Sequence, residues 1–152
     1  MIEILPLHEI EKKVGQEYGV TKWVHIDQAR IDMFAQCSGD DQWIHTDEKR
    51  AARGSYGKTI AQGFLLVSMA GHFVKEFKLV PEGAKMAINY GLNKVRMLNP
   101  VQVGSKIRDR MVLTQVRQKF DDRILVGTQH TIEIQGQNKP ACVFEYVVMY
   151  VV

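Results

Sequence analysis

The chain has 152 residues, of which 45% are hydrophobic and 24% charged, and its formal net charge is +3. These values predict one globular domain over residues 1–152 and argue against a second core. The basic residues are spread along the chain, which argues against a nucleic-acid-binding arm. No apolar stretch approaches the roughly 18 residues of a membrane helix, so no membrane span is expected.

The two cysteines, Cys37 and Cys142, are far apart in the sequence and form no metal-binding motif. Their spacing argues against a disulfide framework and against a structural zinc site. The N-terminal segment carries Glu3 where a signal peptide carries basic residues. We therefore expect a reduced, cytoplasmic protein.

The first half of the chain is expected to be rich in helix. Gly15 and Gly39 are suited to end helices, because glycine readily takes the left-handed conformation of a helix C-terminus. Asp27 is suited to cap a helix N-terminus, since its carboxylate can accept hydrogen bonds from free backbone N–H groups. In chain order, the expected elements are a helix over 7–15, a strand over 22–26, a helix from 27 to 39, and a loop over 40–62 with one helical turn at 47–52.

The second half changes from helix to strand. Residues 64–73 predict a helix buried on most sides, because apolar residues lie nearly all round its helical wheel. Strands are then expected over 84–97, 105–118, 122–135 and 140–151. This order predicts an α+β fold in which an antiparallel sheet wraps around one long central helix. Such a sheet leaves unpaired edges, which predicts dimerisation.

The segment after Gly39 carries the first candidate for chemistry. Asp40 and His45 follow the end of a predicted helix and are separated by four residues in a turning loop. A carboxylate and an imidazole that converge there can hold a water molecule, one accepting a proton while the other donates one. The alternative is a solvated polar loop or a helix cap, and spacing alone favours that alternative.

Gly63 lies directly before the predicted buried helix. The first N–H groups of a helix have no partner within it, so they can bind a polarised carbonyl oxygen. The alternative is that Gly63 only permits a tight turn into the helix.

Taken together, these motifs resemble those of the MaoC-like (R)-specific enoyl-CoA hydratases. The match is closer to the branch named after nodulation protein N, in which Asp-x-Gln-Trp-Ile-His replaces Asp-x-Asn-Pro-x-His. The resemblance covers nearly the whole chain. It rests on Ser38-Gly39-Asp40, His45, Asp47, Ala61, Gly63-Phe64-Leu65, the run 87–96, Pro100-Val101, Val103 and Gly104.

This resemblance implies a hot-dog fold, with a central helix wrapped by the sheet and two subunits paired edge to edge as a homodimer. It also implies reversible hydration of trans-2-enoyl-CoA to (R)-3-hydroxyacyl-CoA. Asp40 and His45 would carry the water and its protons, and the Gly63 N–H would polarise the thioester carbonyl. No metal or other cofactor is expected, because the CoA thioester itself accepts the electron density.

Five further residues are expected at the acyl-CoA substrate. Gln62 stands where the family usually has histidine, and it can donate a hydrogen bond but cannot titrate near neutrality. Trp43 could line the acyl pocket or simply fill a core gap. The other three are Phe64, beside the catalytic glycine, and Lys94 and Arg96, which could reach the CoA phosphates or remain solvated.

Other assignments stay open. Asp41 and Asp47 could join the pair as metal ligands, although Asp47 also fits an N-cap. Hot-dog folds also host acyl-CoA thioesterases, which release free CoA thiol. A third possibility is an acyl-CoA-binding protein without activity, for which Gln62 is the one supporting feature.

Overall fold

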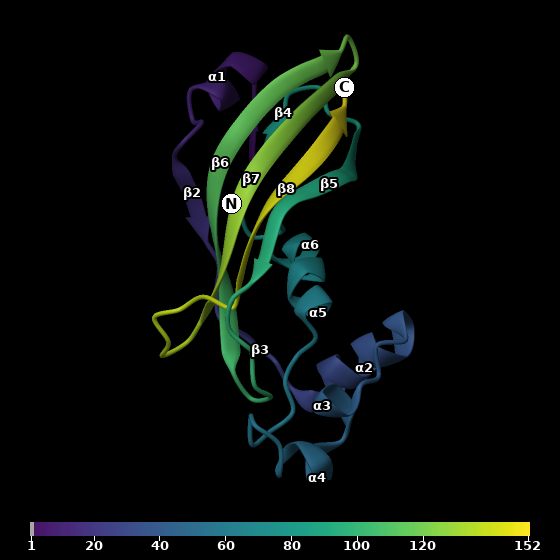
Figure 1. The fold of residues 1–152 in the computed structure, drawn as a ribbon. Coiled ribbons are helices and arrows are strands. Elements are labelled where there is room, and N and C mark those ends of the chain that lie inside the picture. Colours follow the sequence, from purple (N-terminus) through teal and green to yellow (C-terminus); the bar gives the residue numbers. More distant parts are fainter. Residues whose placement is uncertain (1) are drawn as a thin grey trace.

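The computed structural model describes residues 2–152, which form eight strands and six helices (Figure 1). Within this range no helix is long and apolar enough to cross a bilayer. The helices are α1 (Leu7–Glu11), α2 (Gln28–Ser38), α3 (Trp43–Thr46), α4 (Glu48–Ala51), α5 (Gly63–Ser68) and α6 (Ala70–Phe73). The strands are β1 (Ile2–Leu5), β2 (Glu17–Val20), β3 (Val24–His25), β4 (Lys78–Pro81), β5 (Met86–Met97), β6 (Lys106–Phe120), β7 (Arg123–Ile134) and β8 (Cys142–Val151).

The main sheet is antiparallel, with the strand order β2-β6-β7-β8-β5, and β3 also pairs with β6. Its four long strands confirm those predicted from the sequence. On β6, Ile107, Met111 and Leu113 are fully buried and alternate with half-buried residues, as expected of a strand with one face on the core. The predicted α+β architecture is therefore confirmed.

The central helix has the predicted extent, but it is interrupted once and is less buried than predicted. It consists of α5 and α6, which are joined at Met69, where the His72 N–H bonds the Met69 carbonyl at 2.9 Å. This bond to the third preceding residue tightens the turn and interrupts the regular α-helix. Phe64 is 72% exposed, and Ser68 is also exposed. The prediction of a helix buried on most sides is therefore wrong for the outward side of α5, on which these two residues lie.

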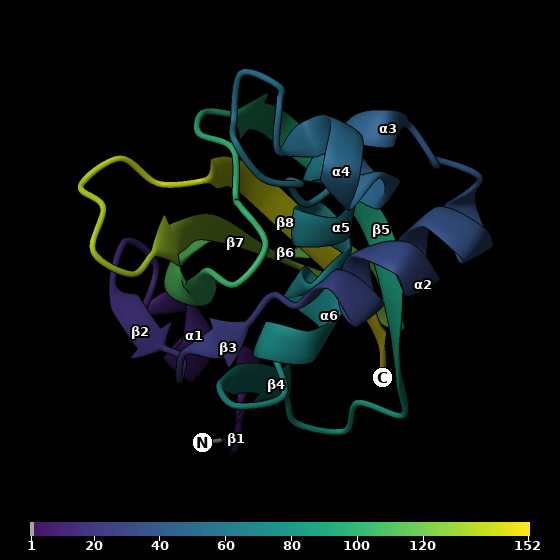
Figure 2. The same cartoon turned by 90° about the horizontal axis from the view of Figure 1, so that it is seen from below.

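The inward face of the central helix forms the main core. Leu66 and Phe73 pack in one cluster with Ile132 of β7 and Phe144 of β8. Figure 2 shows α5 and α6 between the main sheet and α2. Burying each such side chain stabilises the fold by about 1.5–3 kcal/mol, so this packing fixes the position of α5 against the sheet.

Several short elements differ from the sequence-based expectation. The parallel pair β1–β4 and strand β2 were not predicted, because each has four residues and too little alternation to recognise. The helix expected over 7–15 ends at Glu11, although Gly15 does take a positive φ of 85°. The loop expected over 40–62 contains α3 in addition to the predicted turn at α4.

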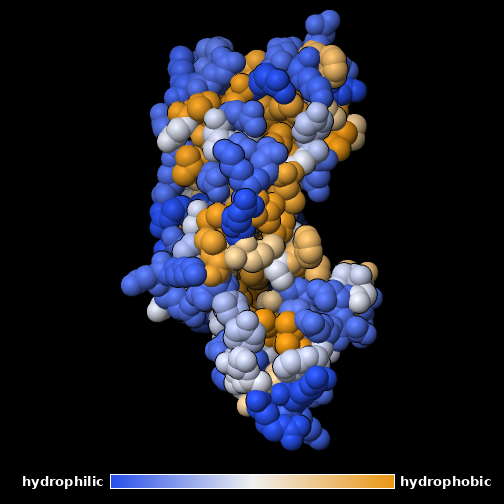
Figure 3. Space-filling view, viewed as in Figure 1, coloured by the Kyte–Doolittle hydropathy of each residue, from blue (hydrophilic) through white to orange (hydrophobic). Residues whose placement is uncertain are grey.

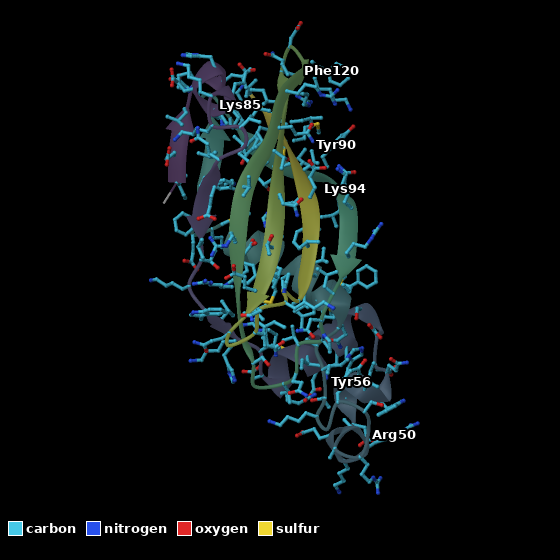
Figure 4. All side chains as sticks on the ribbon, turned by 60° about the vertical axis from the view of Figure 1, so that its left-hand side comes forward. Arg50, Tyr56, Lys85, Tyr90, Lys94 and Phe120 are labelled. Atoms are coloured by element: carbon cyan, nitrogen blue, oxygen red, sulfur yellow. The ribbon has the colours of Figure 1, made fainter. Side chains whose placement is uncertain are left out.

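Strand β5 forms an open edge of the main sheet. Among residues 2–152 it pairs with β8 alone, and nearly all of its residues are exposed. Figure 3 shows apolar surface gathered over the middle of the molecule, and Figure 4 shows Tyr90 and Lys94 along this edge. A long apolar edge is suited to pairing with a second copy. The exposed large apolar side chains of β5 are Met86, Ile88, Tyr90, Leu92 and Met97.

Two glycines of the main sheet allow a test of its packing. A Cβ atom on Gly19 would lie 2.4 Å from Cγ of the Phe77 ring, whereas one on Gly127 would lie 2.5 Å from Cγ of the flexible Gln115 side chain. We expect Gly19→Ala to lower the free energy of unfolding by about 1–3 kcal/mol, because the ring cannot rotate away as easily. Gly127→Ala should have a smaller effect in urea denaturation, and an equal effect of the two substitutions would contradict this packing.

Candidate active site

Asp40 lies at the end of α2, whose two caps were correctly predicted. The Asp27 carboxylate accepts a hydrogen bond from the Arg30 N–H at 2.9 Å, and Gly39 adopts a φ of 77°. The chain turns sharply at Gly39 and releases Asp40, which is half-buried. Within residues 2–152 the Asp40 carboxylate has no hydrogen bond or ion pair, so it is free to accept a proton or to hold water.

Gln62 joins this turn to the start of α5. Its side chain is fully buried, and its Nε2 donates hydrogen bonds to the carbonyls of Ile31, at 3.2 Å, and Asp40, at 3.3 Å. Both amide hydrogens therefore serve the backbone. Oε1 of Gln62 has no partner among the described residues and can only accept. The structure thus places Gln62 as a brace for Asp40, and its predicted contact with substrate stays a prediction.

His45 lies on α3 and is 7% exposed. Its Nδ1 lies 2.6 Å from the Ile60 carbonyl oxygen, which can only accept, so Nδ1 carries the proton. In the neutral ring Nε2 is then unprotonated and can act as a base. Gln28 holds the backbone of His45, donating from Nε2 to its carbonyl at 2.7 Å, and the Thr59 hydroxyl in turn donates to Gln28 at 2.6 Å.

Gly63 begins α5, and its side of the helix faces Met97 of β5. A Cβ atom at Gly63 would lie 3.1 Å from the Met97 sulfur, so a larger residue would crowd this contact. His45, Gly63 and Met97 together line a cavity of about 300 Å³, which also contacts Tyr56. The structure therefore brings His45 and Gly63 to one cavity, and Gln62 connects Asp40 to the same helix end.

The remaining predicted substrate residues lie elsewhere. Trp43 packs beneath the Arg50 guanidinium, at 4.3 Å, and against Gly54, and it does not line the cavity of His45. Figure 4 shows Arg50 and Tyr56 at the helical end of the molecule and Lys94 at the β5 edge. The exposed Arg96 guanidinium bonds the Val95 carbonyl at 2.7 Å.

Phe64 and Lys94 both face away from the core. Phe64 is on the outward stripe of α5, and Lys94 takes a positive φ of 52° at an irregularity of β5. Neither lines the cavity of His45 and Gly63 within one chain. Their contacts with substrate, like those of Trp43 and Arg96, stay predictions.

Asp47 caps α4, as predicted, by accepting the Arg50 N–H at 2.9 Å. Among residues 2–152 no group of three or more His, Cys, Asp or Glu side chains is placed to hold a metal ion. Sequence reasoning missed Gln28, Thr59 and the Ile60 carbonyl, which orient His45. No spacing rule could have found them, because they meet only after the loop has folded.

The hydrogen bonds of Gln62 are expected to contribute to the free energy of unfolding. Gln62→Glu would set a buried carboxylate against two carbonyl oxygens and remove both donors, so it should lower the free energy of unfolding by at least about 2 kcal/mol. Gln36→Glu, an exposed change on α2, is the matched control and should stay within about 0.5 kcal/mol. Equal denaturation midpoints for the two variants would rule out the brace.

Comparison with known proteins identifies the family. Residues 9–135 match the MaoC like domain. The chain is 41% identical to 3-hydroxyacyl-thioester dehydratase Z of Mycobacterium tuberculosis (strain ATCC 25618 / H37Rv), over 94% of both chains. It is 38% identical to Nodulation protein N of Rhizobium meliloti (strain 1021), over 94% of this chain and 89% of that protein.

The fold agrees with that assignment. The structure superimposes on an (R)-hydratase from A. caviae involved in PHA biosynthesis with a TM-score of 0.71 and 24% identity, covering 89% of this chain and 94% of the other. The predicted hot-dog fold and the predicted nodulation protein N branch are thereby confirmed. The chain belongs to the MaoC-like family and is a hydro-lyase of its dehydratase/hydratase type.

Proposed function

We propose that this protein adds water reversibly to trans-2-enoyl-CoA, giving (R)-3-hydroxyacyl-CoA. The observation that carries the proposal is the fixed tautomer of His45. Because Nδ1 donates to the Ile60 carbonyl, Nε2 is left as a base on a ring that borders the same cavity as Gly63. The (R) configuration of the product is supported by the family resemblance and not by the geometry of the site.

In the hydration direction, Asp40 and His45 hold one water molecule. One of them takes a proton as the water oxygen bonds to the β-carbon of the enoyl group. Electron density moves into the thioester carbonyl, whose oxygen accepts a hydrogen bond from the Gly63 N–H. That proton then passes through the pair to the α-carbon, so the water supplies both the hydroxyl group and the added hydrogen, and dehydration follows the same steps in reverse.

The proposal needs no metal or redox cofactor, because the thioester carbonyl supplies the electron sink. Trp43, Phe64, Lys94 and Arg96 do not line the His45 cavity within one chain. They could contact substrate if two copies pair at β5, with Lys94 and Arg96 near the CoA phosphates. The proposed assembly is accordingly a homodimer that binds acyl-CoA.

Replacing either member of the pair tests the mechanism. Asp40→Asn and His45→Gln should each lower kcat for crotonyl-CoA hydration by about 10²–10⁴-fold, since each removes a proton carrier. Asp41→Asn and His72→Gln make the same chemical changes at exposed residues outside the pair, so they are the controls and should retain activity. Circular dichroism must show that all four variants are folded.

A folded Asp40 or His45 variant that kept more than about a tenth of wild-type kcat would overturn its role. Release of free CoA thiol without loss of the enoyl double bond would instead identify a thioesterase. Binding of acyl-CoA without either reaction would identify a binding protein.

The assembly has its own test. Sedimentation velocity at micromolar concentration should give a dimer, because the β5 edge is long, apolar and unpaired within one chain. Tyr90→Lys should shift the equilibrium toward monomer by placing charge on that edge. A wild-type protein that sediments only as monomer would contradict the proposed dimer.

A further inference from the structure

A second polar cluster lies inside the main sheet, away from Asp40 and His45. His130 and Asp109 are 0% exposed, and His130 Nδ1 lies 2.5 Å from Asp109 Oδ2. His130 Nε2 lies 2.8 Å from the Thr128 hydroxyl, and Phe144 stacks on the imidazole ring. The strand pairing places these side chains on the inward face of β6 and β7, so the cluster holds the Thr128 hydroxyl in a fixed position.

Thr128 is part of the wall of a cavity of about 220 Å³ between α6, β4 and the main sheet. The Tyr146 hydroxyl bonds Asn89, and the Tyr150 hydroxyl donates to the Leu79 carbonyl at 3.2 Å. Burial raises the pKa of Tyr18, so that phenol stays protonated and can donate. The polar residues of this wall are Tyr18, Lys78, Asn89, Thr128, Tyr146 and Tyr150.

Lys78 provides the only formal charge among the residues lining this cavity. Its ammonium lies 5.7 Å from the centroid of the Tyr150 ring, and none of the ion pairs among residues 2–152 includes it. Lys78 is half-buried and lines the cavity together with residues that carry hydroxyl groups. Such a wall favours an oxygen that accepts hydrogen bonds, and favours an anionic oxygen most.

This cavity lies farther along the central helix than the candidate active site, because Gly71 lines the one and Gly63 lines the other. A hollow of about 310 Å³, lined by Val67 and Ser68 on one side and β5 on the other, shares Gly71, Asn89 and Tyr146 with it. From Gly63 to Gly71 the central helix rises by about 12 Å. Figure 1 shows α5 and α6 in succession along β8 and β5, leading away from the α2–α4 end.

Along the central helix, Gly63 and Leu66 line the first cavity, Val67 and Ser68 the hollow, and Gly71 the polar cavity. An acyl chain that runs along the helix from a thioester at Gly63 would therefore point toward Lys78. We propose that this polar cavity binds an acceptor oxygen at the far end of the acyl chain. The substrates would then be enoyl thioesters that end in a carboxylate or a keto group, in preference to plain alkyl chains. This inference rests on the proposed hydratase function.

Hydration of three ten-carbon substrates tests the inference. They are trans-2-decenoyl-CoA, its 9-oxo derivative, and the mono-CoA thioester of trans-2-decenedioic acid. We expect kcat/KM for at least one oxygen-ended substrate to exceed that for the alkyl substrate by about tenfold or more, the effect of one charge-assisted hydrogen bond. If the diacid is preferred over the ketone, the charge of Lys78 contributes to the preference. If these two substrates react at equal rates, hydrogen bonding alone accounts for it.

Lys78→Met should reduce that preference about tenfold, and Thr128→Val should reduce it independently. Lys85→Met, at an exposed lysine outside the cavity wall, is the matched control and should leave the preference unchanged (Figure 4). Equal kcat/KM for the three substrates, or a preference for the alkyl chain, would overturn the inference.

If none of the three substrates is hydrated, the proposed hydratase function is wrong. The inference about the polar cavity is then tested by measuring the binding of acyl thioesters. Calorimetry would then compare the saturated ten-carbon alkyl and diacid thioesters. Tighter binding of the diacid by wild type, lost in Lys78→Met, supports the polar end site. Equal affinities overturn it.

Discussion

The packing of α5 and α6 against the inward face of the main sheet is the constraint on which the other features depend. Leu66 and Phe73 bury their side chains among residues of β7 and β8, which fixes the axis and the start of the helix. Gln62 then ties that start to the Asp40 turn through two hydrogen bonds to backbone carbonyls. Because the Gln62 side chain is fully buried, the position of the Asp40 turn relative to Gly63 depends on the packing of the core.

The same packing divides the molecule into two chemically different ends. At the start of α5, His45 has one ring nitrogen held by a backbone carbonyl and the other available as a base. Beyond the end of α6, hydroxyl groups and one ammonium line the second cavity. A thioester at the first end and an oxygen at the second would both find hydrogen-bond partners, with apolar helix and strand surface between them.

Local sequence signals predicted the parts of this arrangement that depend on local chemistry. Asp27, Gly39 and Asp47 act on backbone groups within a few residues, so their roles as caps and stops could be predicted. The four long strands were found for the same reason, since their alternation is visible along the chain. The Asp40–His45 spacing and Gly63, together with the family resemblance, predicted the candidate site.

The parts that were missed depend on contacts between distant segments. The tautomer of His45 is set by Ile60, and Gln62 serves Asp40, 22 residues before it, as well as α2. The buried pair of Asp109 and His130 forms only when β6 and β7 align. Short strands such as β4 have no periodicity of their own, and they are stabilised by the partner against which they lie.

The most direct measurement of the central claim is the stereochemistry of hydration. In the proposed mechanism, one water molecule held between Asp40 and His45 would attack only one face of an enoyl group whose carbonyl is bound at Gly63. Crotonyl-CoA would be hydrated in the presence of NAD and an (S)-specific 3-hydroxyacyl-CoA dehydrogenase. Loss of the enoyl absorbance without formation of NADH is the predicted result, whereas strong NADH formation would contradict the proposed site.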